Sequence, residues 1–265
     1  MNNEDSKGSI YEQLDKLTLA DLYASFEKDT GTNKQETGKK KGISPEECLY
    51  DKLYICPICG NNFRSKTVRK GKVKFISNEL DLKPIYEPIQ PDYYDIVLCD
   101  KCGYTSISSK FDKLTDSQEE LIKENITPKF FPKQYPNIYT VDVAIERYKL
   151  ALINAMVKKA KAGEKAYLCL KLAWFYRDKR DMNNEIMYLK AAHKGFNDAF
   201  VNERFPICGL EENTLLYIIA AIGTRIGKID DSLRILSRLI VKKGLNTRLK
   251  NKIFDLKELL KKMKT

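Results

Sequence analysis

With 265 residues, the chain is long enough for one large domain or two modest domains, each with its own hydrophobic core. Apolar residues make up 43% of the sequence. No apolar run reaches the roughly 18 residues that a membrane-spanning helix needs, which excludes a transmembrane protein. The first ten residues, MNNEDSKGSI, lack the basic and apolar regions of a secretory signal, so we expect a cytoplasmic protein.

Charge is distributed unevenly along the chain. The net charge is +11, and the part from Val141 onward carries 26 Lys and Arg against 14 Asp and Glu, so the basic excess lies in the C-terminal half. This asymmetry favours an acidic or polyanionic partner. Lysine-rich helix faces in contact with water are the simpler explanation, and this alternative stays open.

Residues 1–47 are predicted to form an N-terminal extension and a flexible linker. One short helix is expected over Ile10–Phe26, where leucines recur with a loose helical spacing. The stretch Gly31–Gly42, GTNKQETGKKKG, has no aromatic residue and no periodicity, which is typical of a linker. We therefore place the first domain boundary before Cys48.

Residues 48–126 are predicted to form a small, β-rich, zinc-ribbon-like domain. Short β-like runs precede each of two cysteine pairs, and another lies between them; these runs are Leu53–Ile55, Val73–Ile76 and Tyr93–Leu98. Residues 127–140 contain three prolines and cannot continue a helix, so they are predicted to be an extended, proline-rich connector.

Residues 141–265 are predicted to be helical throughout. Apolar residues recur there at three- and four-residue steps, and glycines or polar turns separate six segments. These segments are Val141–Lys161, Lys165–Tyr176, Asn184–Phe200, Glu211–Ile226, Asp230–Lys242 and Thr247–Lys262. The motif Leu172-Ala173-x-x-Tyr176 is similar to the small-residue pattern of tetratricopeptide repeats. The predicted fold class is α+β, a zinc-ribbon-like module followed by an all-α, tetratricopeptide-like helical stack.

Two Cys-x-x-Cys-Gly pairs carry the strongest chemical signal in the sequence. Cys56 with Cys59, and Cys99 with Cys102, each place two thiolates on one tight turn. In a reducing compartment, seven cysteines, an odd number, favour metal binding over a disulfide framework. We predict one structural Zn²⁺ held by these four thiolates, with an iron site or a redox-active dithiol as the competing interpretations. The other cysteines are expected to be buried as small apolar residues; they are Cys48, Cys169 and Cys208.

The chain resembles a bacterial family of unknown function in three segments: LYDKLYICPICGNNF, PIYEPIQPDYYDIVLCDKCGY and ERYKLALINAMVKKAKAGEKAYLCLKLAWFYR. The resemblance covers Leu49–Lys243 and implies a zinc-ribbon-like N-terminal region joined to tetratricopeptide-like helices in a cytosolic protein. The four paired cysteines match the family's pattern. Residues 1–47 and the basic C-terminal tail depart from it.

Basic and aromatic residues alternate after the first cysteine pair. Such a pattern is typical of proteins that bind single-stranded nucleic acid. The candidates for contact with nucleic acid or another anion are Arg64, Lys66, Arg69, Lys70, Lys72 and Lys74. The alternative is a half-buried strand whose lysines lie in water while its aromatic residues form a small core.

No motif in the sequence indicates catalysis. His193 is the only histidine and is expected on a helix surface, and neither standard form of the phosphate-binding glycine loop occurs. We therefore predict a non-catalytic, zinc-stabilised adaptor whose helical stack binds a protein or peptide partner, which the basic excess predicts to be acidic. The candidates for the partner-binding face are Tyr148, Tyr167, Trp174 and Tyr217. Nucleic-acid binding through the zinc module and the basic helices is the alternative function.

Overall fold

The structure is a computed structural model that describes residues 43–242 and 244–264. The predicted helix Ile10–Phe26 and the linker after it lie outside this range. Two compact units make up the chain. Among the described residues, the cysteine unit comprises 43–76 and 86–159, and the helical unit comprises Ser77–Ile85, 160–242 and 244–264. In the described range, no helix has the length and apolar character needed to cross a membrane.

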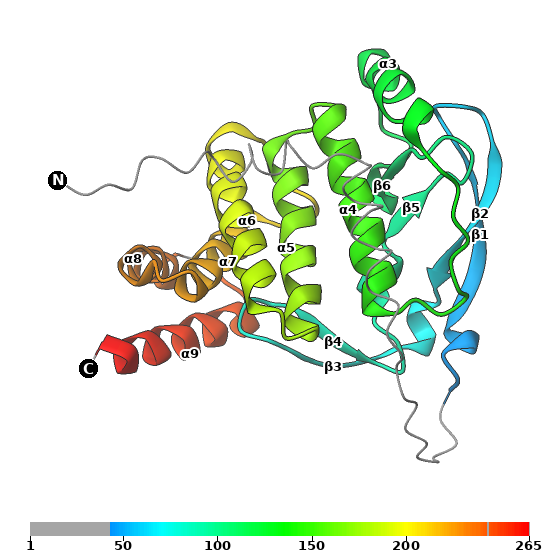
Figure 1. Cartoon of the computed structure of the whole chain (residues 1–265). Coiled ribbons are helices and arrows are strands. Elements are labelled where there is room, and N and C mark those ends of the chain that lie inside the picture. Colours follow the sequence, from blue (N-terminus) through cyan, green and yellow to red (C-terminus); the bar gives the residue numbers. More distant parts are fainter. Residues whose placement is uncertain (1–42, 243, 265) are drawn as a thin grey trace. The chain divides into compact units, whose positions relative to one another are not determined.

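The strands form short two-stranded sheets (Figure 1). The pairs are β1 (Leu49–Ile55) with β2 (Asn62–Val68), β3 (Lys74–Asn78) with β4 (Pro84–Glu87), and β5 (Ile96–Leu98) with β6 (Thr105–Ile107). The first and third pairs are antiparallel, and in each a Cys-x-x-Cys-Gly sequence connects the two strands. The predicted runs Leu53–Ile55 and Tyr93–Leu98 therefore contribute to hairpins around the cysteines, although residues 93–94 form a 3₁₀ turn, and the predicted run Val73–Ile76 lies largely in β3.

Aromatic side chains form the core of the cysteine unit beside the cysteines. The rings of Tyr54, Phe63, Tyr104 and Phe111 contact one another with centroids between 4.9 and 6.0 Å apart. Short 3₁₀ turns lie before, between and after the strands; they are η1 (Glu46–Cys48), η2 (Lys70–Lys72), η3 (Pro91–Tyr94), η4 (Ser108–Lys110) and η5 (Thr127–Lys129). Because this core is small, the stability of the cysteine unit depends strongly on the packing around the cysteines.

Helix α3 (Asp116–Asn125) has no counterpart among the predicted elements. It begins at a capping box in which the Thr115 hydroxyl accepts from the Gln118 amide, and the Gln118 side chain accepts from the Thr115 amide. Only Ile122 of this helix is buried. Its two apolar residues, Leu121 and Ile122, are adjacent and give no helical periodicity, which explains why the sequence pattern does not indicate this helix.

Helix α4 (Val141–Val157) belongs to the cysteine unit, whereas the predicted boundary assigns it to the helical stack. Its Arg147 donates to the carbonyl of Ile96 (2.7 Å), and its Tyr148 hydroxyl donates to the carbonyl of Asp92 (2.8 Å). The side chain of Asn154 accepts from the amide of Thr105 (3.2 Å). These buried hydrogen bonds attach α4 to η3 and to the β5–β6 hairpin, so the division of the chain lies near residue 160 instead of 140.

The helical unit contains α5 (Ala162–Asp178), α6 (Met182–Asn202), α7 (Glu212–Arg225), α8 (Ile229–Ile240) and α9 (Thr247–Lys264). Their ends lie within four residues of the predicted segments, so periodicity predicts this part of the chain well. Close helix crossings are possible because small residues are buried at them, as at Gly223, where an added Cβ would lie 2.5 Å from the Ser232 hydroxyl oxygen.

His193 lies in the core of the helical unit, so the predicted surface position is wrong. Its side chain is 7% exposed, and its Nδ1 lies 3.3 Å from the Asn197 amide nitrogen. Both faces of α6 are covered, because α5 packs on one side and α7 on another. A single polar residue in a helical sequence does not indicate that a second helix packs on that helix.

Candidate metal centre and helical groove

The first cysteine pair forms a tight turn that a second turn repeats. The amide of Cys56 donates to the carbonyl of Asn61 (2.9 Å), and the amide of Gly60 donates to the carbonyl of Cys56 (2.9 Å). In the second turn, the amide of Cys99 donates to the carbonyl of Tyr104 (2.9 Å), and the fifth residue of the motif, a glycine, donates back to Cys99 (3.0 Å). The same five-residue motif therefore produces the same backbone at both sites.

The glycine of each motif has a left-handed conformation, with φ of +68° at Gly60 and +77° at Gly103. Glycine adopts this conformation without steric cost. The two positions differ in their surroundings. Nothing lies within 4 Å of a Cβ built on Gly60, whereas a Cβ on Gly103 would lie 2.4 Å from Cγ of Phe130. The second turn is therefore packed against the connector, and the first is open.

The two turns bring four sulfur atoms together. Sγ of Cys56 lies 3.5 Å from Sγ of Cys102, and Sγ of Cys59 lies 3.7 Å from Sγ of Cys99. All four atoms lie within 4.8 Å of one another, and none is in a disulfide. Four thiolates arranged as a tetrahedron about 2.3 Å from one ion would be about 3.8 Å apart. The donor set therefore fits a single metal ion, as the spacing predicts.

Three of the four cysteines are buried and Cys59 is partly buried, and the cluster resists more than one negative charge without a cation. Hydrogen bonding with the thiols of Cys56 and Cys99, together with burial, raises the pKa of the Cys102 thiol well above its usual range. A metal cation would stabilise the thiolates, so metal binding would release protons and weaken at low pH. An additional hydrogen bond links the two turns, from Asn61 Nδ2 to Asp100 Oδ1 (2.8 Å). The sequence gives no signal for this bond between the turns.

The remaining cysteines lie outside the cluster. Cys48 is buried with its Sγ 3.4 Å from the carbonyl of Lys72, and burial raises its pKa. Cys169 is buried in α5, where burial raises its pKa to about 12. Cys208 is half-buried with its Sγ 3.7 Å from the carbonyl of Gly163. Cys48 and Cys169 are buried as expected, and Cys208 is only partly so.

The predicted basic residues lie on β2, the loop after it and the start of β3. Several are held by neighbouring groups of the same unit: Lys66 pairs with Asp51 (3.0 Å) and Lys72 lies 4.0 Å from a Glu47 oxygen. The guanidinium of Arg69 lies over the Tyr50 ring, 5.1 Å from its centroid. The exposed members of the set are Arg64, Arg69, Lys70, Lys72 and Lys74.

Three of the four aromatic residues proposed for the partner-binding face are buried. Tyr148, in the cysteine unit, and Tyr217 are 0% exposed, and Trp174 is 4% exposed. Tyr167 is half-buried, with the Lys171 ammonium 5.2 Å from its ring centroid. The buried three are core residues, so they offer no surface to a partner.

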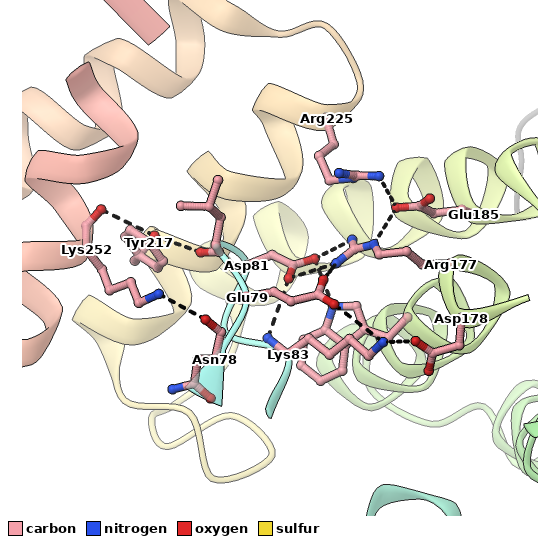
Figure 2. Close-up of polar contacts among 12 residues, drawn as sticks. Asn78, Glu79, Asp81, Lys83, Arg177, Asp178, Glu185, Tyr217, Arg225 and Lys252 are labelled. Carbon is pink, nitrogen blue, oxygen red and sulfur yellow. Dashed lines mark hydrogen bonds and ion pairs between the residues drawn. The ribbon is translucent and has the colours of Figure 1, made fainter. Parts of the chain in front are cut away.

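Trp174 and Tyr217 instead bind a segment of the same chain. We call Ser77–Ile85 the inserted segment, because it lies far from α5 in sequence but belongs to the helical unit. Nε1 of Trp174 donates to Oδ2 of Asp81 (2.9 Å), and the Tyr217 hydroxyl donates to the carbonyl of Leu80 (2.7 Å). The Lys252 ammonium donates to the carbonyl of Asn78 (3.1 Å). Figure 2 shows these contacts around the inserted segment.

Arg177 of α5 is the centre of this polar cluster (Figure 2). It forms a two-pronged pair with Asp81, with Nη1–Oδ1 and Nη2–Oδ2 distances of 3.1 and 2.6 Å, and its Nε lies 2.8 Å from Glu185. It also pairs with Glu79, which pairs in turn with Lys83. Burial opposes the charge of Arg177, but the hydrogen bonds and charges of these carboxylates prevail and raise its pKa.

Sequence analysis missed this cluster. Asp81 is 2% exposed and Arg177 lies 96 residues further along the chain, so no local pattern links the two. The only available signal is the acidic pair Glu79 and Asp81 between two β-like runs. Acidic residues in a turn are common, and a turn beside a strand does not indicate a contact with a distant helix.

A groove adjoins the cluster within the helical unit. It has a volume of about 600 Å³. Its apolar lining comes from α6, α7 and α9 and from the inserted segment, and its polar lining includes both arginines of the cluster, Arg177 and Arg225. The apolar lining residues are Leu80, Met182, Ile186, Ala221, Leu256 and Leu259. A volume of this size is sufficient for a small molecule or for a few side chains of a bound peptide.

Residues 49–260 match the family described as "Uncharacterized protein conserved in bacteria (DUF2225)". The chain belongs to this family. A protein of Borreliella burgdorferi, described as an uncharacterized protein, is 24% identical over 164 residues, which cover 51% of this chain and 56% of that relative. The chain thus spans just over half the length of that relative. No solved structure matches.

The family match covers both candidate sites. The matched range includes all four clustered cysteines, the inserted segment and every residue that lines the groove. It ends within α9, five residues before the C-terminus. The sequence resemblance to a bacterial family of unknown function is therefore confirmed.

Proposed function

We propose that this chain is a zinc-stabilised, non-catalytic adaptor whose helical unit binds a segment of a partner protein. In this proposal the cysteine unit is zinc-ribbon-like, and helices α5–α9 form a tetratricopeptide-like stack. The groove carries the proposal, because it combines an apolar lining with charged groups at its border, as surfaces that bind peptides do. Three of its apolar residues are exposed: Met182 (71%), Leu80 (41%) and Leu259 (40%).

A structural role for the metal centre is supported by its donor set. Four thiolates complete a tetrahedral site and leave no position for substrate, unlike catalytic zinc sites, which keep one position open. Cys56, Cys59, Cys99 and Cys102 would hold the ion. Metal analysis of the purified protein should find one zinc ion per chain, and four thiols should become reactive together when the zinc is chelated. A coloured protein containing iron would contradict the choice of zinc.

Site-specific photocrosslinking in the native cell tests the adaptor role. A photoreactive amino acid at Met182, which lines the groove, should form a covalent adduct with a defined partner. The matched control is Val201, which lies on the same helix α6, is 78% exposed and does not line the groove. Equal crosslinking at both positions, or none at Met182, would contradict the proposal.

Nucleic-acid binding by the cysteine unit is the second candidate. The observation that favours it is the exposed pair of Lys74 and Phe75 on β3, where Phe75 is 48% exposed and its ring contacts Tyr86 (centroids 5.5 Å apart). A base can stack on such a ring while nearby cations contact the phosphates. Retention on single-stranded nucleic acid should then fall steeply with salt. Retention that does not change with salt, or no retention, would exclude this function.

A further inference from the structure

The inserted segment shows what kind of peptide the helical unit holds. Helices α5, α7 and α9 bind the run Asn78-Glu79-Leu80-Asp81 in two ways. Arg177 holds the carboxylates of Glu79 and Asp81, while Lys252 and Tyr217 donate to main-chain carbonyls. The helical unit therefore already recognises an acidic segment with an apolar residue between its carboxylates.

Four of the five N–H donors of Arg177 are already used within the chain. Its Nε, Nη1 and Nη2 atoms all donate to carboxylates of Glu185, Glu79 and Asp81, and its side chain is 15% exposed. Glu79 is 31% exposed, but its charge is compensated by both Arg177 and Lys83. These groups hold the inserted segment and one border of the groove.

Arg225 provides a different environment at the same groove. Its Nη2 lies 2.7 Å from Glu185 Oε1, and 44% of its side chain is exposed (Figure 2). A guanidinium has five N–H donors, so one ion pair leaves donors on the exposed side for a second carboxylate. The apolar residues Ala221, Leu256 and Leu259 line the same groove. The groove at Arg225 therefore combines one accessible cation with an apolar surface.

We propose that the groove at Arg225 binds an acidic amphipathic segment of a partner protein. A carboxylate of the segment binds Arg225, and its apolar side chains pack on Met182, Ile186, Leu256 and Leu259. This inference rests on the adaptor function proposed above and specifies the chemistry of the partner. Charge supports it, since residues 160–265 carry 22 Lys and Arg against 12 Asp and Glu.

Two designed peptides test the charge preference directly. Both have leucines at the same helical positions; one has glutamates at the remaining positions and the other has lysines. Each carries a fluorescent label, and its binding to the full chain is followed by fluorescence anisotropy. The glutamate peptide should bind, and the lysine peptide should bind at least about tenfold more weakly, the factor expected for one charge-assisted hydrogen bond.

Two pairs of variants locate the binding site. Arg225→Gln should weaken the glutamate peptide about tenfold, whereas Arg234→Gln, at an exposed arginine of α8, should not change it. Leu259→Gln should also weaken binding, with Val241→Gln as its exposed apolar control. The fluorescence of Trp174, the only tryptophan, shows whether each variant keeps the packed helical unit.

The outcomes separate this inference from the adaptor proposal. No binding of the glutamate peptide, a preference for the lysine peptide, or equal losses in Arg225→Gln and Arg234→Gln would overturn the acidic partner. If Met182 still crosslinks to a partner, the groove remains the binding site and only the chemical class is wrong. Binding of decanoate without binding of the glutamate peptide would assign the groove to a small amphiphile and overturn the protein segment.

Discussion

The cysteine unit and the helical unit are stabilised in different ways. The cysteine unit has two-stranded sheets with strands of at most seven residues, and such sheets are marginal by themselves. Its sheets meet at four thiols. The helical unit buries long helices against one another and encloses the charged cluster at Arg177. One unit would therefore depend on an ion bound at these thiols, and the other depends on a nine-residue segment from a distant part of the sequence.

Loss of one metal ligand should have the largest effect. Cys99→Ser removes a thiolate from a buried site and should abolish stoichiometric metal binding, because structural zinc contributes about 10–16 kcal/mol to small zinc-dependent folds. Metal analysis and far-UV circular dichroism would measure the loss. Cys169→Ser, at a buried cysteine outside the cluster, is the matched control and should keep the metal. Equal metal content in both variants would disprove the assignment.

Breaking the charged cluster should destabilise the helical unit alone. Asp81→Asn leaves Arg177 without its two-pronged partner, and removing one member of a buried ion pair costs about 3–5 kcal/mol. Denaturant unfolding followed by Trp174 fluorescence would measure this change, while metal content stays the same. Asp231→Asn, at the exposed pair with Arg234, should cost less than about 1 kcal/mol. Similar losses in both variants would mean that Arg177 does not hold the inserted segment.

Two glycine substitutions compare the two cysteine turns. Gly60→Ala and Gly103→Ala both place a side chain at positive φ, at a cost of about 1–2 kcal/mol. Gly103→Ala should cost a further 1–3 kcal/mol or so, because its Cβ would overlap Phe130. Competition with a chelator would report the stability of each site. Phe130→Ala should rescue Gly103→Ala, and equal effects at both glycines would show that the connector does not pack on the second turn.

The smallest expected effect is a pH dependence in the helical unit. Burial and the charge of Lys228 lower the pKa of His193 to about 4, against a partial opposing effect of Asp231. As the pH falls, the histidine of the unfolded chain is protonated first, because its pKa is about 6.5. The contribution of neutral, buried His193 to the free energy of unfolding is therefore complete above about pH 6.5 and declines toward pH 4. His193→Gln should reduce the change of the free energy of unfolding with pH, measured by denaturant unfolding followed by Trp174 fluorescence. An unchanged pH dependence would show that His193 does not contribute to it.

Local patterns predict most of the secondary structure and the four cysteines that the fold brings together. The helices of the helical unit show clear periodicity, and a five-residue cysteine motif specifies its own turn, so Cys56, Cys59, Cys99 and Cys102 are recognisable without a fold. The second strand of each cysteine hairpin is harder to predict from the sequence. These strands, β2 and β6, follow the cysteines and have short, largely polar sequences. Local information is sufficient where one element determines its own structure.

Contacts between distant segments could not be predicted. The placement of α4 with η3 and the β5–β6 hairpin depends on Arg147, Tyr148 and Asn154, which look like ordinary helix residues in the sequence. The pairing of Asp81 with Arg177 likewise depends on the position of the inserted segment. Buried polar groups acquire partners only in the folded chain, and three of the four aromatic residues proposed for a surface, Tyr148, Trp174 and Tyr217, are core residues for this reason.

Hydrogen exchange measured by mass spectrometry, with and without a metal chelator, tests the difference between the units most directly. The account predicts that chelation removes protection from β1, β2, β5 and β6 and leaves α5, α6 and α7 protected, with Trp174 fluorescence unchanged. Protection that stays in the hairpins after complete metal removal would contradict a cysteine unit stabilised by an ion. Loss of protection in α5–α7 at the same time would contradict a helical unit stabilised by its own cluster.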